Sequence, residues 1–250
     1  MEIKVHKTAG ELGKAAGVET AKLIRDAIQK NGSANIILAT GTSQFEVLRQ
    51  LIAEPGIDWS KVVMFHLDEY IGIPISHPAS FRKYLNERFL SKVPHLKAAY
   101  LINGEADPKK ECERLNSIIA QHPIDVALAG IGENGHLAFN DPPADFDIED
   151  PYIIVELDYD CRKQQFGEGW FKSIEDVPKQ AISMSIKQIM KSGNIICSVP
   201  DERKATAVKN TLKKPVSNLH PASILQNHPH CAIYVDNASY ALVSDMQHIL

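Results

Sequence analysis

The sequence contains few cysteines and no pattern typical of a metal centre or a disulfide framework. Only four of its 250 residues are cysteine: Cys112, Cys161, Cys197 and Cys231. None belongs to a C-x-x-C pair, and none has a histidine at the spacing of zinc ligands, so the sequence predicts no metal site. Scattered cysteines of this kind are typical of reduced thiols, and we therefore expect a cytoplasmic protein.

The chain also lacks long apolar runs and a strong charge of either sign. No apolar run approaches the roughly 18–20 residues of a membrane-spanning helix, and residues 1–7 lack the apolar centre of a signal peptide. The formal net charge is only -4. A nucleic-acid-binding face needs a concentration of Lys and Arg, so this balance argues against one. We expect neither a membrane nor a nucleic acid as partner.

Short apolar segments alternate with segments of helical periodicity along the chain. The apolar segments predict buried strands, for example at residues 34–39, 62–67, 124–131 and 194–199, and helices are predicted at residues 10–31, 108–121 and 201–212. This alternation implies right-handed crossovers and a mostly parallel, Rossmann-like sheet covered on both faces. With 44% hydrophobic residues and no convincing linker, we expect a single α/β domain over residues 1–250.

The most informative stretch follows the apolar segment at residues 124–129. Gly132, Asn134, His136 and Asp141 come where a strand is expected to end. Ligands of open α/β sheets bind at the carboxyl ends of the strands. His136 supplies an imidazole, the side chain best suited to proton transfer, and Asp141 is placed to orient it or set its charge. The alternative interpretation is a tight turn with a structural, hydrogen-bonded histidine.

The segment Thr40-Gly41-Thr42-Ser43 lies between a predicted strand and a predicted helix. Backbone N–H groups at a helix start, together with three hydroxyl groups, favour an anion. The segment is neither a Walker A motif nor a G-x-G-x-x-G motif, so nucleotide binding is not indicated. Lys204, near the start of a later helix, is a candidate cation for the same site. An ordinary capped turn and a solvated lysine are the alternatives.

Asp68 opens the segment Asp68-Glu69-Tyr70, directly after the predicted strand at residues 62–67. Adjacent side chains diverge at a strand end, so only one of the two carboxylates needs to face a ligand. A carboxylate in a cleft removes a proton from a carbon next to a carbonyl if burial raises its pKa. An aspartate that caps the next segment is the alternative.

Three motifs, in this order, resemble the glucosamine-6-phosphate deaminase (isomerase) family, which is related to the 6-phosphogluconolactonases. They are residues 67–74 with 77–81, residues 130–142, and residues 223–229. The ending Ala138-Phe139-Asn140 is similar to the deaminases, and the Ser-Leu-Phe-Pro ending usual in the lactonases is absent. The resemblance implies a three-layer α/β/α fold, a phosphorylated amino sugar as the small-molecule partner, and no metal or organic cofactor.

The resemblance also implies roles for individual residues. His136 matches the histidine that helps to open the sugar ring. Asp68 matches the aspartate that moves a proton from C2 to C1, after which imine hydrolysis releases ammonia and a keto sugar phosphate. The phosphate is expected on residues 40–43 with Lys204 nearby. Arg162, in a divergent segment, is a further candidate for phosphate binding.

Two positions depart from the family pattern. Asn134 and Asp141 stand where the best-known deaminases carry Asp and Glu, the two carboxylates that flank the ring-opening histidine. Besides the deaminase, two functions therefore stay open: a lactone hydrolase in which His136 activates water, and a sugar-phosphate sensor without turnover, which Asn134 makes conceivable. A homo-oligomer is also left open by the sequence.

Overall fold

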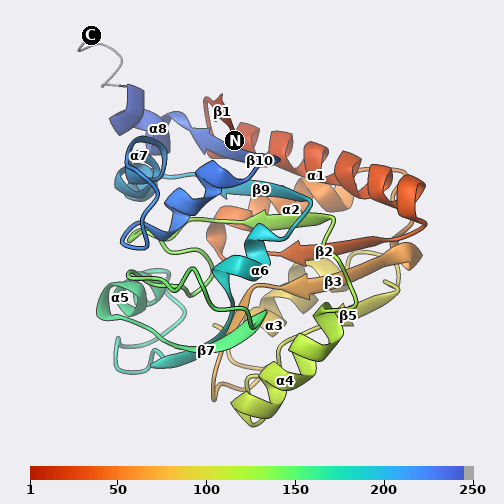
Figure 1. The fold of residues 1–250 in the computed structure, drawn as a ribbon, viewed down its shortest axis with the longest axis horizontal. Coiled ribbons are helices and arrows are strands. Elements are labelled where there is room, and N and C mark those ends of the chain that lie inside the picture. Colours follow the sequence, from red (N-terminus) through yellow and green to blue (C-terminus); the bar gives the residue numbers. More distant parts are fainter. Residues whose placement is uncertain (245–250) are drawn as a thin grey trace.

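The computed structural model describes residues 1–244 and is built around a seven-stranded sheet (Figure 1). All its strand pairs are parallel, and the order is β1-β10-β9-β6-β2-β3-β5. The strands are β1 (Glu2–His6), β2 (Ala34–Leu38), β3 (Val62–His66), β5 (Ala98–Tyr100), β6 (Val126–Ala129), β9 (Asn194–Val199) and β10 (Cys231–Asp236). Nearly continuous apolar sequence in β2, β3 and β6 matches their burial in the centre of a parallel sheet.

Helices flank the sheet in three α/β/α layers, as predicted. The helices are α1 (Ala9–Asn31), α2 (Phe45–Ala53), α3 (Phe81–Leu85) with a π-helical continuation (Asn86–Leu90), α4 (Pro108–Ile119), α5 (Tyr159–Gly167), α6 (Ile186–Met190), α7 (Ala205–Lys213) and α8 (Asn237–Ser244). Helix α1 packs closely on α2 because Gly13 has no side chain. A Cβ atom there would lie 2.2 Å from the Glu46 Cβ. Among the described residues, none of the helices combines the length and apolar character needed to cross a membrane.

A second, antiparallel sheet was not predicted. Its order is β4-β8-β7, with β4 (Asp68–Tyr70), β8 (Gln180–Met184) and β7 (Tyr152–Glu156). Residues 68–70 are thus a short strand and not the end of β3, because they pair with β8, which is more than one hundred residues away in the sequence. A small aromatic core lies beside this sheet, where Tyr70 contacts Phe139 and Phe171. This pairing fixes the direction of Asp68.

Several elements differ from the sequence prediction in detail. Strand β1 and helices α5, α6 and α8 were not predicted. The predicted helix at residues 201–212 begins with a 3₁₀ turn (Glu202–Lys204). The Asp201 side chain caps this turn and accepts a hydrogen bond from the Arg203 N–H. All four cysteines are free and buried, in agreement with reduced thiols.

Candidate active site

One cavity lies where β2, β3, β6 and β9 end, and it collects most of the residues predicted from the sequence. The turn at residues 40–43 follows β2, Asp68 begins just after β3, His136 follows β6, and Lys204 follows β9. The lining is formed by residues 39–43, 67, 68, 81, 130–132, 136, 138, 139, 164, 165, 168, 203 and 204. The structure therefore brings these carboxyl-terminal loops together around one cavity.

The turn at residues 40–43 is held rigidly against its neighbours. Gly41 has a φ of 93°, a conformation that favours glycine. Its carbonyl accepts hydrogen bonds from the Tyr84 hydroxyl at 2.9 Å and the Gln44 N–H at 3.2 Å. The buried Gln44 amide donates to the Ala129 carbonyl at 3.2 Å, which ties the turn to β6. The first N–H groups of the helical segment that follows have no partner within it and are available to an anion.

Lys204 supplies a buried cation to this end of the cavity. Only 9% of the residue is exposed, and burial lowers the pKa of its ammonium group. Within residues 1–244 its side chain makes no hydrogen bond or ion pair. The negative charges of Glu133 and Glu168 oppose the effect of burial on this pKa, and a buried ammonium group that makes no hydrogen bond favours an anionic ligand beside it.

Arg203 is a lining residue that the sequence analysis missed. Its guanidinium group lies 2.9 Å from Asp201 Oδ2 and 3.6 Å from Glu133 Oε1. These two carboxylates hold it at the rim of the cavity, next to Lys204. The only signal in the sequence was its place beside Lys204, in a turn whose geometry the sequence pattern does not reveal.

Arg162 does not reach the cavity. In helix α5 its guanidinium group donates to the carbonyls of Ile174 at 2.7 Å and Val177 at 3.3 Å, so it ties α5 to the following loop. This helix instead contributes Gln164, Gln165 and the nearby Glu168 to the lining. The expected phosphate contact by Arg162 is therefore not present, because the helix turns that side chain toward the loop at residues 174–177.

Asp68 lines the same cavity as a buried acid. Only 7% of the residue is exposed, and its carboxylate accepts no hydrogen bond from the described part of the chain. Burial, and then the negative charge of Glu69, raise the pKa of Asp68 to about 8. A carboxyl group with this pKa is suited to taking up and returning a proton near neutral pH.

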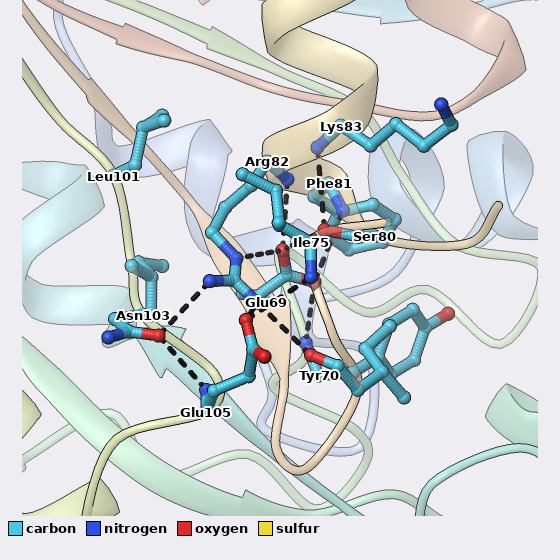
Figure 2. Close-up of polar contacts among 12 residues, drawn as sticks. Glu69, Tyr70, Ile75, Ser80, Phe81, Arg82, Lys83, Leu101, Asn103 and Glu105 are labelled. Carbon is cyan, nitrogen blue, oxygen red and sulfur yellow. Dashed lines mark hydrogen bonds and ion pairs between the residues drawn. The ribbon is translucent and has the colours of Figure 1, made fainter. Parts of the chain in front are cut away.

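Glu69 has a different task, although it is the next residue (Figure 2). It is fully buried and faces away from the cavity into a network of donors. Its carboxylate accepts hydrogen bonds from Ser80 Oγ (2.9 Å) and from the N–H groups of Arg82 (2.9 Å), Tyr70 (3.0 Å) and Phe81 (3.1 Å), and Arg82 Nε lies 3.3 Å away. Burial raises the pKa of Glu69, and these donors oppose that effect. Glu69 thus anchors β4 to the start of α3.

The loop after β6 holds His136 against Asp141. His136 Nδ1 lies 3.1 Å from Asp141 Oδ1. Asp141 also accepts hydrogen bonds from the Asn134 amide and the Asp158 N–H, each at 3.0 Å. Burial acts to raise the pKa of Asp141, but these donors and the His136 ring outweigh it, and the pKa lies below its usual value. The ring packs over Gly132, where a Cβ atom would lie 2.2 Å from His136 Cε1.

Comparison with known proteins places the chain in a family. Residues 7–233 match the family described as "Glucosamine-6-phosphate isomerases/6-phosphogluconolactonase". The chain belongs to this family. A glucosamine-6-phosphate deaminase of Lactobacillus delbrueckii subsp. bulgaricus is 36% identical, with 97% of this chain and 100% of the relative covered. One of Listeria monocytogenes serovar 1/2a is 38% identical over 92% of this chain and 97% of the relative.

Solved structures of the family share the fold. A monomeric glucosamine-6-phosphate deaminase superposes with a TM-score of 0.86 at 30% identity, covering 97% of this chain and all of that one. A 6-phosphogluconolactonase of Trypanosoma brucei has a TM-score of 0.78 at 18% identity, covering 96% and 98%. The second likeness concerns the fold alone.

The structure shows how Asn134 and Asp141, the two residues that depart from the family pattern, fit together. Asn134 donates its amide to Asp141, a bond that an ionised aspartate is unable to donate. The shorter Asp141 still reaches the His136 ring. The Asn134 Oδ1 accepts a hydrogen bond from the His136 N–H at 3.0 Å, so one side chain orients both partners.

Proposed function

We propose that this protein is a glucosamine-6-phosphate deaminase that converts glucosamine 6-phosphate and water to fructose 6-phosphate and ammonia. The observation that carries the proposal is the shared cavity of Asp68, His136 and Lys204, a proton carrier, an imidazole and an unpaired buried cation. Relatives with this activity in their names match nearly the whole chain at 36% and 38% identity, which supports the same chemistry here.

The phosphate group of the substrate binds at the turn of residues 40–43. Its negative charge meets Lys204, whose ammonium group makes no hydrogen bond within residues 1–244, and Arg203 at the rim. Backbone N–H groups at the start of the following helix complete the anion site. This end of the cavity fixes the sugar so that its reacting carbons lie toward Asp68 and His136.

His136 opens the sugar ring. The C1 hydroxyl loses its proton, the bond between C1 and the ring oxygen breaks, and the ring oxygen gains a proton, with the imidazole passing the proton between the two oxygens. Asp141 holds a negative charge beside the ring at 3.1 Å. Asn134 and the Asp158 N–H keep that carboxylate in place.

Asp68 then moves a proton between two carbons. Its ionised form removes the proton from C2 of the open-chain sugar, which gives an enolamine, and returns the proton to C1, which gives an imine at C2. Water adds to the imine and ammonia leaves. Although burial favours the protonated form of Asp68, a substrate ammonium group nearby favours the ionised form.

The test is a coupled assay of the purified chain with glucosamine 6-phosphate, following ammonia and fructose 6-phosphate separately. We expect the two products in equal amounts and no release from Asp68→Asn. Acid release from 6-phosphogluconolactone without any ammonia from the amino sugar would establish the lactone hydrolase instead. Measured binding of the amino sugar phosphate with no turnover of either substrate would identify a sensor.

The proposal also covers the cellular location and the oligomeric state of the enzyme. We propose that it acts in the cytoplasm, as its reduced thiols suggest. Light scattering of the purified protein distinguishes the monomer from the homo-oligomer that the sequence leaves open.

A further inference from the structure

A cluster of three potential metal ligands lies directly behind the cavity wall. A ring nitrogen of His136, a carboxylate oxygen of Asp141 and Cys161 Sγ all lie within 4.8 Å of one another. The sequence did not indicate this, because Cys161 is 25 residues from His136 and comes from a helix that was not predicted. Cys161 is fully buried, and His136 is only 6% exposed.

One atom of the cluster contacts a neighbour without a well-formed hydrogen bond. His136 Nδ1 is buried and, although it lies 3.1 Å from Asp141 Oδ1, the contact does not have the geometry of a hydrogen bond. Buried polar atoms in folded proteins are nearly always satisfied, so an orphaned ring nitrogen needs an explanation. Here the nitrogen faces a carboxylate, with a thiol beside them, and these three donor types together are able to bind a transition-metal ion.

We propose that His136, Asp141 and Cys161 bind a zinc ion or a similarly thiophilic divalent cation, and that the ion inhibits the enzyme. Nitrogen, sulfur and oxygen donors in this combination are those of zinc, whose tetrahedral ligands are spaced by about 3.5 Å and which keeps a fourth position for water or substrate. Magnesium and calcium take oxygen ligands and are not expected to bind. A thiolate and a carboxylate neutralise the double positive charge in a buried place.

The surroundings of the cluster suit this role. Asp158 links two of the ligands, since its N–H donates to Asp141 and its side chain accepts from the Cys161 N–H at 2.6 Å. Asn134 donates to Asp141 from the other side. Such outer hydrogen bonds fix the direction of metal ligands. On binding, His136 and Asp141 give lone pairs to the ion, the Cys161 S–H bond is replaced by a bond from sulfur to the metal, and the thiol proton passes to solvent.

A metal bound to a ring nitrogen holds His136 away from the sugar oxygens and so blocks ring opening. The proposed inhibition therefore rests on the proposed function, in which His136 opens the ring. Binding itself does not depend on that function. The two are therefore separable, and the first experiment measures binding alone.

Binding is measured by titrating ZnCl₂ into the metal-free full chain in a calorimeter. We expect one site that Cys161→Ser weakens by about tenfold or more, since serine keeps a hydroxyl donor but removes the sulfur ligand. The matched control is Cys112→Ser, which also removes a buried thiol but should leave the affinity unchanged. MgCl₂ should give no heat of binding. Equal zinc affinity in wild type and Cys161→Ser overturns the proposal.

A measurement on the wild type alone covers the case in which Cys161→Ser fails to fold. CoCl₂ should give the intense charge-transfer absorption of a bond between sulfur and cobalt, and ZnCl₂ should remove it by displacement. A cobalt spectrum without sulfur ligation contradicts the site, whatever the behaviour of the variants.

The activity assay completes the test. ZnCl₂ should inhibit ammonia release, EDTA should restore it, and Cys161→Ser should keep its zinc-free turnover within about threefold while resisting zinc. If zinc binds through Cys161 but the chain releases no ammonia, the metal site stands and the proposed function fails. If ammonia is released but Cys161→Ser is inhibited as readily as wild type, the metal site fails and the function stands.

Discussion

Asp68 and Asp141 are two buried carboxyl groups at one active site, and the structure gives them opposite properties. Asp68 receives no hydrogen bond from the described residues, and burial with the nearby charge of Glu69 raises its pKa to about 8. Asp141 receives donors from Asn134 and Asp158 and lies beside His136, and its pKa is lowered in spite of burial. Burial without any donor, reinforced by the charge of Glu69, therefore makes Asp68 a proton carrier, whereas the donors and the His136 ring make Asp141 a fixed charge.

The largest effect is expected when the proton carrier is removed. Asp68→Asn keeps the shape of the side chain but is unable to take the C2 proton, so we expect kcat for ammonia release to fall by about 10³-fold or more. The fold should be retained, because the carboxylate makes no hydrogen bond that the variant loses. Circular dichroism and the thermal midpoint check folding. Turnover within tenfold of wild type would exclude Asp68 from proton transfer.

Removal of the imidazole tests the proposed role of His136 in ring opening. His136→Gln should lower kcat/KM by about 10²-fold on closed-ring substrate, and by less on a substrate analogue fixed in the open-chain form, since only the former needs ring opening. The comparison of the two substrates is the measurement. Equal losses would mean that His136 and Asp141 act in a step other than ring opening. The comparison of Asp141 with Asp68 would then no longer assign separate steps to the two aspartates.

A smaller effect is expected at the anion site, away from both aspartates. Lys204→Ala removes the unpaired cation and should raise KM for the phosphorylated sugar by about 10- to 100-fold with a smaller change in kcat. Arg162→Ala is the matched control, because that guanidinium group binds the carbonyls of Ile174 and Val177 and should leave KM nearly unchanged. A larger rise in KM for Arg162→Ala than for Lys204→Ala would place the phosphate elsewhere.

The sequence predicted much of this site because local patterns mark the ends of parallel strands. The turn at residues 40–43, Asp68 and His136 each follow an apolar segment, and in a parallel sheet such positions meet at one edge. The prediction from sequence failed where the position of a side chain depends on contacts between segments that are far apart in the chain. The pairing of β4 with β8 and the helix that carries Arg162 and Cys161 leave no local periodicity, so the arginine was misplaced and the thiol beside His136 was missed.

The smallest effect, on stability, tests the comparison of the two aspartates most directly. The folded-state pKa of Asp68 is raised, so its contribution to stability is full below its unfolded pKa of about 3.9 and is lost as the pH rises toward 8. The stability of Asp68→Asn relative to wild type should therefore increase between pH 4 and pH 8. The pKa of Asp141 is lowered, so its contribution is present at neutral pH and is lost as the pH falls through the folded-state value.

Asp141→Asn should accordingly be less stable than wild type at pH 7, with a penalty that shrinks in acid. Thermal midpoints of wild type and both variants, measured in EDTA from about pH 2 to pH 8 so that the range extends below the ordinary carboxyl pKa, give the two trends, at about 2–4 °C for each kcal/mol in a chain of this size. Parallel trends in the two variants would mean that the donors around Asp141 do not offset its burial. The division of the two carboxyl groups into proton carrier and fixed charge would then be wrong.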